Sequence, residues 1–400
     1  MAIAGMRGTG DWGTDERPKN FRETILWRNP NGSAPLTALM SKMKSESVDD
    51  PEFAWWEEEM NALRLTMANG TAYATTDNTI VVTSNVSSAL DCVEGDIFMV
   101  EKTLTSAYDH ELIVVSSVTD TTTVVFKRAQ LGTAGAPIGI AATLTKVGNA
   151  FAEGSGAPSA STRNPTKLYN YVQIFKTAYD ITNTAKTTKS RTGDPVKNDK
   201  KRKMFDHAVM LEFASFFGKR YEGTGSNGKP LRSSGGLLYF LSQYASSMIT
   251  VFATTPTETT FTDAVYKVFD YDTGAGDERI VMAGNGALNS LNRLANSQSR
   301  TRVNFDGLVN LYGMKLQRWV LPQGVLYVKS HPLFNTHARF TNDMAILDPT
   351  AMRFRPKRDT TFQDNIQLPD ADETKGQWLT EAGFEFQHLK TSAWISNFVV

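Results

Sequence analysis

The sequence predicts an α+β fold with a separate β-rich module, and three observations lead to this prediction. Residues 69–148 are rich in Thr, Val, Ser and Ala and contain short strand-like runs. A long helical stretch follows Asp194, and after Thr257 strands and helices are mixed. Because the mixture has no regular βαβ order, α+β fits better than a doubly wound sheet.

Composition limits the classes of protein to which the chain can belong. It has 400 residues with 42 Lys+Arg and 42 Asp+Glu, so its formal net charge is zero, and 40% of its residues are hydrophobic. At about 150 residues per domain, this length predicts two or three domains. Intrinsic disorder is excluded because it needs low hydrophobicity and a large net charge. A globally basic nucleic-acid binder is excluded because no long-range field attracts phosphate.

Cysteine usage and hydropathy indicate a protein made in a cytoplasm. Cys92 is the only cysteine, which excludes an intrachain disulfide and zinc sites built on paired cysteines. No run reaches the ~18–20 apolar residues of a membrane span. The N-terminal segment is charged and has no apolar core, so we expect neither a secretory signal nor a membrane partner.

Residues 1–68 are predicted to form an N-terminal arm. The first 35 residues are rich in Gly, Asn, Pro and charge, and their large apolar side chains cluster at Phe21, Ile25 and Trp27. Such a segment cannot bury itself, so it is either a disordered tail or an arm that orders on a partner. The large apolar side chains favour the arm.

A second aromatic cluster ends this arm. Within residues 51–65, the side chains of Trp55, Trp56, Met60 and Leu63 have the spacing of a short helix or of an aromatic anchor. The sequence leaves these two alternatives open.

Residues 69–148 are predicted to form an inserted barrel or sandwich. Their runs are rich in β-branched residues and separated by polar turns that contain Gly95, Asp109 and Asp120. The module is mildly acidic, with eight acidic and four basic side chains. The expected strands are residues 79–84, 96–102, 111–119, 122–128 and 142–148.

Residues 149–192 are predicted to form an extended loop and a returning strand. Gly, Pro and Ser dominate residues 150–168, and the alternating residues that follow indicate a long strand. Residues 193–256 contain the strongest helix prediction. Asp194 is a good N-cap residue before a proline at the first helical position, and we expect the helix to stop at Gly223.

Residues 257–376 are predicted to form a second α+β domain, and residues 377–400 a closing strand. The expected helices begin near Phe261 and Asn285, and a buried strand lies between them. Two further strands are expected on either side of Leu321 to Gly324.

The motif search finds no convincing catalytic or ligand site. GTGSNGKP, residues 223–230, satisfies GxGxxG, but it follows a helix and has Pro230 where a phosphate-binding loop needs Ser or Thr. A turn needing positive φ explains it better. VMAGNGALNSL, residues 281–291, is interpreted as a tight strand-to-helix turn. The five histidines have no metal-ligand spacing, so we expect no metal, no cofactor and no enzyme.

Charge is strongly uneven along the chain. Eight bases and two acids lie between Lys186 and Lys203, and an acidic stretch follows Glu258. The basic stretch is interpreted as a solvated helix face, a nucleic-acid contact or a contact with an acidic surface of a neighbouring copy. The residues singled out as candidate contacts are Lys197, Lys200, Lys201, Arg202 and Lys203, together with Asp270, Asp272, Asp277 and Glu278.

The order of these parts resembles tailed-bacteriophage major capsid proteins of the Hong Kong 97 type, in the subgroup with an inserted β-rich domain. The resemblance rests on FAEGSGAPSASTRNPTKLYNYVQIFKTAYDIT, HAVMLEFASFFGKRYEGTGSNGKPLRSSGGL, AVYKVFDYDTGAGDERIVMAGNGALNSL and LYGMKLQRWVLPQGVLYV, in that order. It covers residues 150–400. It implies a peripheral domain over 193–256 with a spine helix, an axial domain over 257–376, and a closing strand that returns to the peripheral domain.

The resemblance also implies partners. The chain would assemble with itself into pentamers and hexamers around packaged double-stranded DNA, which it would contact without sequence specificity. Portal, scaffold or protease and decoration proteins are further partners in such systems. The virion would be its location after assembly in the host cytoplasm. Some relatives cross-link through a loop lysine, but the matching AEGSGAPS has none, and only Arg163 and Lys167 lie further along as candidate contacts.

Three other functions remain open from the sequence. A cellular encapsulating compartment would have the same fold and a cargo enzyme. An adhesin or glycan-binding protein would use residues 69–148 as its working module. A nucleotide-dependent enzyme would use residues 223–229. Residues 69–148 are expected to face outward on a shell, because an inserted module is easiest to accommodate away from the packed body.

Overall fold

The structure consists of two compact units, residues 56–167 and residues 168–400 with the segment before 56. The computed structural model describes residues 45–58, 64–68, 71–83, 91–101, 111–160, 162, 164–190, 193–271, 276–297, 305–311 and 314–400. The predicted contact residues Phe21, Ile25, Trp27, Arg163 and Asp272 lie outside these ranges, as do Met60 and Leu63.

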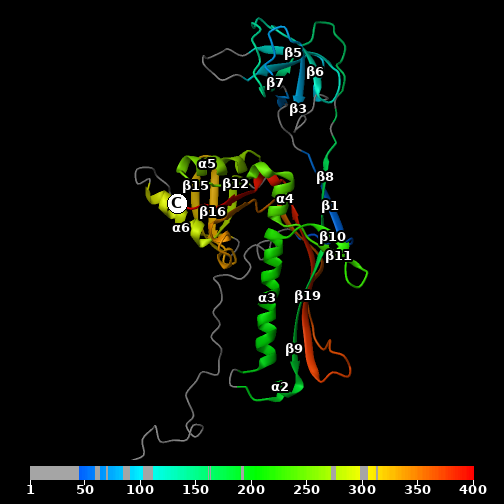
Figure 1. The fold of residues 1–400 in the computed structure, drawn as a ribbon, viewed down its shortest axis with the longest axis vertical. Helices are drawn as coiled ribbons and strands as arrows, with labels where there is room; N and C mark the ends of the chain where they lie inside the picture. The colour runs from blue at the N-terminus through cyan, green and yellow to red at the C-terminus, as the bar shows by residue number, and fades with distance from the viewer. Residues whose placement is uncertain are drawn as a thin grey trace, which may run out of the picture. The chain divides into compact units, whose positions relative to one another are not determined.

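The smaller unit is a closed six-stranded barrel with strand order β2-β3-β6-β5-β4-β7 (Figure 1). All five predicted strands are confirmed, and the alternative of a sandwich is wrong. Alternate residues such as Ile80, Phe98 and Val115 fill its core. The strands are β2 (Arg64–Met67), β3 (Thr79–Thr83), β4 (Asp96–Val100), β5 (Leu112–Val118), β6 (Thr123–Lys127) and β7 (Thr143–Asn149).

The barrel unit begins before residue 69, where the sequence placed its start. Leu65 and Met67 on β2 are 0% and 2% exposed and belong to the barrel core. This strand is only four residues long, too short to reveal its alternation in the sequence. Its pairing with β3 and β7 closes the barrel and removes the free edges that an open sheet would leave.

A buried ion pair fastens the long loop after β6 to the barrel wall. Arg128 Nε and Nη2 each donate to one carboxylate oxygen of Glu111, both at 2.7 Å. Arg128 also donates to the carbonyls of Ala74, Asp77 and Ala136. Both side chains are almost fully buried, and a buried charge is costly unless its remaining hydrogen-bonding sites are satisfied. Glu111 meets this need because it also accepts from the backbone amides of Ala129 and Ala136.

In the larger unit, a long helix packs along a three-stranded antiparallel sheet of order β18-β19-β9 (Figure 1). The predicted returning strand is confirmed as β9, but it is an edge strand of this sheet and does not stand alone. The elements are β8 (Thr166–Tyr171), β9 (Gln173–Thr182), α2 (Asn183–Thr187), α3 (Pro195–Phe217), β18 (Met352–Gln363) and β19 (Glu373–Phe386).

Helix α3 starts where the sequence predicts and ends earlier. The side chain of Asp194 accepts from the amide of Val196 at 2.9 Å, which confirms the N-cap. The predicted end at Gly223 is wrong, because Gly218 is the C-cap. A Cβ on Gly218 would lie 2.4 Å from the carbonyl oxygen of Ser234, so only glycine allows the chain to turn here.

The glycine-rich stretch after α3 is the turn of a hairpin. Strands β10 (Tyr221–Thr224) and β11 (Pro230–Ser233) pair antiparallel on either side of it. Gly228 has φ +73°, which confirms the prediction of a turn that needs positive φ. Strand β11, and not a helix, follows the stretch directly, so its amides do not lie at a helix N-terminus that could join them in a phosphate site.

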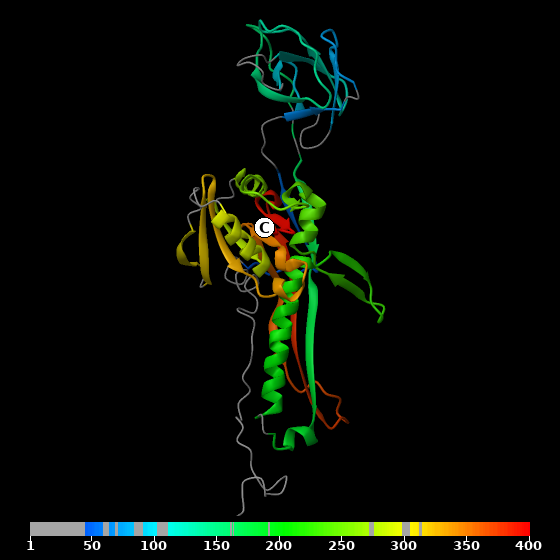
Figure 2. The same cartoon turned by 60° about the vertical axis from the view of Figure 1, so that its left-hand side comes forward.

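A mixed seven-stranded sheet of order β12-β20-β17-β13-β16-β15-β14 forms the second part of the larger unit (Figure 2). The predicted helices, buried strand and strand pair of this region are confirmed. Its strands are β12 (Ile249–Val251), β13 (Glu278–Ala283), β14 (Phe305–Leu311), β15 (Met314–Leu321), β16 (Gly324–Ser330), β17 (Met344–Leu347) and β20 (Ala393–Ser396). Its helices are α4 (Leu237–Tyr244), α5 (Glu258–Val265) and α6 (Asn285–Ser297), with short 3-10 helices η2 (Ser246–Met248), η3 (Tyr266–Phe269), η4 (Phe334–Thr336), η5 (Phe340–Asn342) and η6 (Leu389–Thr391).

The C-terminal segment differs from its prediction. It is not one strand: β19 already begins at Glu373 in the three-stranded sheet, and β20 lies inside the seven-stranded sheet. His388, with φ +48°, and the turn of η6 redirect the chain between them. All four residues of β20 are buried, which suits a strand covered on both faces.

Segment 51–58 is a strand and not a helix. β1 (Glu52–Glu57) pairs with β8, and its side chains alternate between buried and exposed. Phe53 and Trp55 are buried, whereas Trp56 is 64% exposed. The aromatic-anchor alternative holds for Trp55, whose ring lies 5.7 Å from that of Phe240 on α4, but not for the exposed Trp56. Met60 and Leu63 lie outside the described residues.

Candidate functional site

The segment that leads out of the arm is fixed on the edge strand β18. Ser45 forms a parallel bridge with Phe354, and the amide of Val48 donates to the carbonyl of Pro356 at 3.1 Å. The carboxylate of Glu46 accepts from Arg353 at 3.0 Å and also from Arg355. Over 300 residues separate these groups in sequence, so no local pattern could predict the contact.

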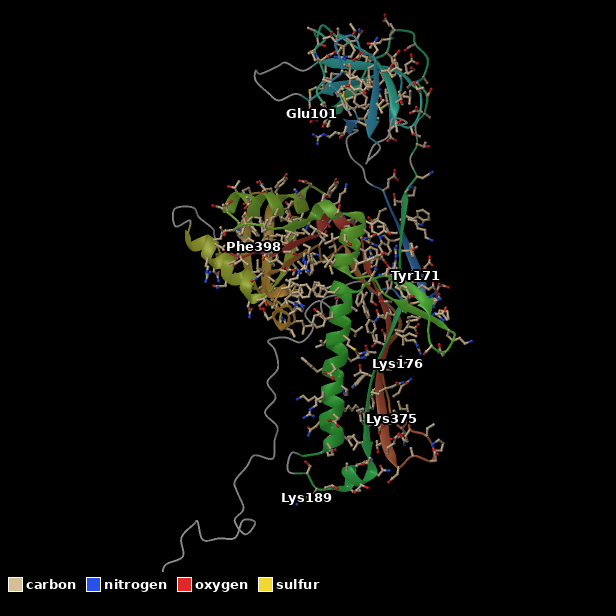
Figure 3. All side chains as sticks on the ribbon, viewed as in Figure 1. Glu101, Tyr171, Lys176, Lys189, Lys375 and Phe398 are labelled. Atoms are coloured by element: carbon tan, nitrogen blue, oxygen red, sulfur yellow. The ribbon has the colours of Figure 1, made fainter. Side chains whose placement is uncertain are left out.

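The predicted basic stretch lies on α2, on the loop after it and on the first turns of α3. Figure 3 shows Lys189 at the end of the three-stranded sheet that is farthest from Phe398. The side chains of Lys197, Lys201 and Arg202 are exposed. Arg202 pairs with Asp199 at 3.6 Å and Lys203 with Asp206 at 3.3 Å, which are surface pairs of little energetic weight.

Lys200 has a different role from the rest of the basic stretch. Its Nζ lies 3.4 Å from the ring centroid of Phe362 and 5.9 Å from that of Trp378. Its carbonyl accepts from the indole of Trp378 at 3.4 Å. Lys200 therefore fastens the start of α3 to β18 and β19 and is not directed at a partner.

The acidic candidates lie on the other part of the unit. Asp270 follows η3, and Asp277 and Glu278 stand at the start of β13; all three are exposed. Glu278 accepts from the hydroxyl of Tyr327 at 3.0 Å. Figures 1 and 2 place the chain after α5 in the seven-stranded part, far from α2 and the start of α3. The structure does not bring the two charged groups together within one chain.

Buried histidines in the described residues form hydrogen bonds that link separate elements of the same chain. His207 on α3 bonds to Thr177 on β9 at 3.1 Å and to Thr380 on β19 at 2.7 Å. Burial lowers its pKa, so the ring stays neutral at pH 7. His331 and Glu212 form a fully buried pair at 2.7 Å between the seven-stranded part and α3.

Reactive groups do not converge in the part of the chain that is described. No group of three or more His, Cys, Asp or Glu residues in this part could hold a metal ion. Cys92 is buried in the barrel core, and Lys167 is exposed on β8. None of the described helices is long and apolar enough to cross a membrane.

A family model described as SU10 major capsid protein matches residues 5–398. The chain belongs to this family, and the expectation of a phage major capsid protein is thereby confirmed.

A relative and several solved structures resemble the chain. The major capsid protein of Pseudomonas phage PaMx41 is 30% identical over 342 residues, which cover 84% of this chain and 78% of the relative. The Mycobacterium phage Bobi structure covers 96% of both chains at 10% identity and a TM-score of 0.45. An encapsulin from Synechococcus elongatus covers 60% of this chain and 77% of its own at 10% identity and a TM-score of 0.42.

Proposed function

We propose that copies of this chain form the closed icosahedral head of a tailed phage around packaged double-stranded DNA, as pentamers and hexamers. The family match over residues 5–398 supports the proposal most directly. The division into a peripheral part (α3 with β18-β19-β9) and an axial part (the seven-stranded sheet) agrees with it. The subunit would act by packing alone, without catalysis or cofactor.

Electron microscopy and sedimentation of the chain expressed alone test this proposal. We expect shells, sheets or tubes with hexamer-sized units. Assembly could depend on other proteins of the same genome, so the second arm co-expresses scaffold or protease, portal and decoration proteins. A monomer in both arms, at high protein concentration and low salt, would contradict the proposal.

DNA as cargo needs a separate measurement, because an encapsulating compartment would form shells as well. Particles isolated from infected cells are treated with nuclease, and the protected nucleic acid is sized. We expect genome-length double-stranded DNA. Shells that protect a host enzyme and no DNA would instead identify a compartment of the encapsulin kind.

The barrel of residues 56–167 is proposed to face outward on the shell. The support for this proposal is that the barrel has its own closed core and its own buried ion pair and so forms a compact unit separate from the rest of the chain. Antibodies against residues 112–127 are expected to label intact particles in immunogold microscopy. Failure to label, with strong binding to denatured particles, would place the barrel inside or within a contact.

A further inference from the structure

The β10–β11 hairpin carries an apolar face that its own chain does not cover. Tyr221 and Leu231 lie on one face of the hairpin, with Gly223 between them, and are 56% and 58% exposed. The Tyr221 hydroxyl would lie 2.3 Å from a Cβ on Gly223, so the ring lies flat along the hairpin. An isolated two-stranded hairpin is marginally stable in water, and Figure 2 shows this one standing away from α3.

The loop between β18 and β19 of the same unit also exposes apolar side chains, and its charge is opposite to that of the hairpin. The loop that joins β18 to β19 exposes Leu368 at 70% and Ile366 at 37%. Residues 364–373 contain four acidic side chains and no basic one, whereas residues 219–233 contain four basic side chains and one acidic. Arg232 pairs with Glu222 at 2.8 Å and Arg220 donates to groups of its own unit, so the exposed bases of the hairpin region are Lys219 and Lys229. Both features combine an apolar centre with charge, and the charges are of opposite sign.

These two features are held at opposite ends of β9. Gln173, at the start of β9, accepts from the amide of Ser234 at 3.1 Å and so holds the base of the hairpin. At the other end, Tyr179 donates to Asp364 at 3.4 Å, and Asn183 donates to Asp372 at 2.5 Å. At about 3.3 Å per residue, the strand separates them by about 30 Å. One chain cannot bring them together without breaking this sheet.

We propose that the β10–β11 hairpin of one copy docks on the 364–373 loop of a second copy. Leu231 and Tyr221 pack on Leu368, and the bases near the hairpin face the acids of the loop. The contact is head-to-tail, since each copy uses two different surfaces, and contacts of this kind close into rings when the rotation permits. The proposal rests on the proposed function for the existence of an assembly and adds which surfaces meet.

Cysteine cross-linking in assembled particles tests the contact. Cys92, the only native cysteine, is 5% exposed and does not compete. The double variant Leu231→Cys/Leu368→Cys is treated with a short bis-maleimide and run on a denaturing gel. We expect a ladder of covalent multimers. The matched control is Val251→Cys/Leu368→Cys, because Val251 is 63% exposed on the same unit but lies outside the proposed contact.

Particles of normal appearance whose cross-linking does not exceed that of the control would overturn the contact and leave the shell-forming function intact. Charge reversal supplies a second readout if the cysteine variant does not assemble. Lys229→Glu and Asp370→Lys are each expected to lower the assembled fraction about ten-fold, since like charges then face each other, and the double variant to restore it. If the assembled fraction fell by the same factor in the single and the double variants, while the melting temperature of the subunit stayed unchanged, the proposal would also be contradicted.

Discussion

Glu111 shows how much a single buried carboxylate contributes to the barrel. Burial raises its pKa, but the hydrogen bonds from Arg128 and two backbone amides outweigh burial, so the pKa ends below its ordinary value of 4.5. Removal of one partner from such a pair leaves a buried charge without compensation, which costs about 3–5 kcal/mol. We expect Arg128→Met to expose β5 and β6 to rapid hydrogen exchange, while the exposed-pair variant Arg64→Met leaves their exchange unchanged.

The same carboxylate makes barrel stability depend on pH. Because the folded pKa of Glu111 is lowered, its contribution is fully present above the unfolded value of about 4.5 and is lost as pH falls through the folded pKa. Hydrogen exchange of β5 in the native protein should therefore accelerate as the pH is lowered below about 4.5, after correction for intrinsic exchange. Glu111→Gln should flatten this dependence, and an unchanged slope would contradict the account.

His207 is the corresponding group in the peripheral part. Its pKa is lowered by burial, so the neutral ring is favoured in the folded state. The stability that it contributes is present above the unfolded value of about 6.5 and falls as pH decreases, because the unfolded chain then binds the proton more readily. We expect the melting temperature of the native chain to drop between pH 7 and pH 5. The drop should be smaller in His207→Gln, whereas the control His337→Gln, which changes an exposed histidine, should show the same drop as the native chain.

At the scale of elements, the two ends of α3 differ in how strongly they constrain the sequence. Asp194→Ala removes one cap bond and should cost about 1 kcal/mol. Gly218→Ala is expected to cost more, since its Cβ would lie 2.4 and 2.5 Å from two backbone carbonyl oxygens that cannot move independently. Chemical denaturation of the two variants should rank them in this order, and the reverse order would contradict the packing described here.

The same helix shows what the sequence could and could not predict. Its start is encoded locally, by a capping side chain before a proline, and was predicted correctly. Its end depends on the approach of Ser234, which only the folded chain brings near. The strands of the barrel were visible as alternating β-branched runs, whereas β2 is too short to show the pattern.

Candidate site residues were harder to predict than elements. The basic stretch was visible as a run of charge, but Lys200 turned out to pack on Phe362, a contact across 162 residues that no run of charge reveals. The anchor of Glu46 on Arg353 and Arg355 was missed for the same reason. Local sequence encodes which groups are charged, and tertiary structure decides which of them remain for a partner.

At the scale of the molecule, the Glu46 anchor connects the arm to the body. Glu46→Lys would place a like charge beside Arg353 and Arg355, and we expect the segment around residues 45–48 to leave β18. Limited proteolysis should then cut before residue 51 at least several-fold faster, while the melting temperature of the larger unit stays close to that of the native chain. Lys357→Glu is the matched surface control, and equal cleavage rates in both variants would contradict the anchor.

The pairing of β1 with β8 determines how easily the segment between these strands can be lost or replaced in evolution or by engineering. The two strands lie side by side, so the chain leaves the larger unit and re-enters it at neighbouring points. The chain between β1 and β8 is therefore a single long connection within the larger unit, and the two ends of this connection lie next to each other. Such a connection can be shortened to a simple turn or exchanged for a foreign domain with closely spaced termini. The barrel is thus a removable cassette, and the β1–β8 strand pair is a natural grafting point for engineered display.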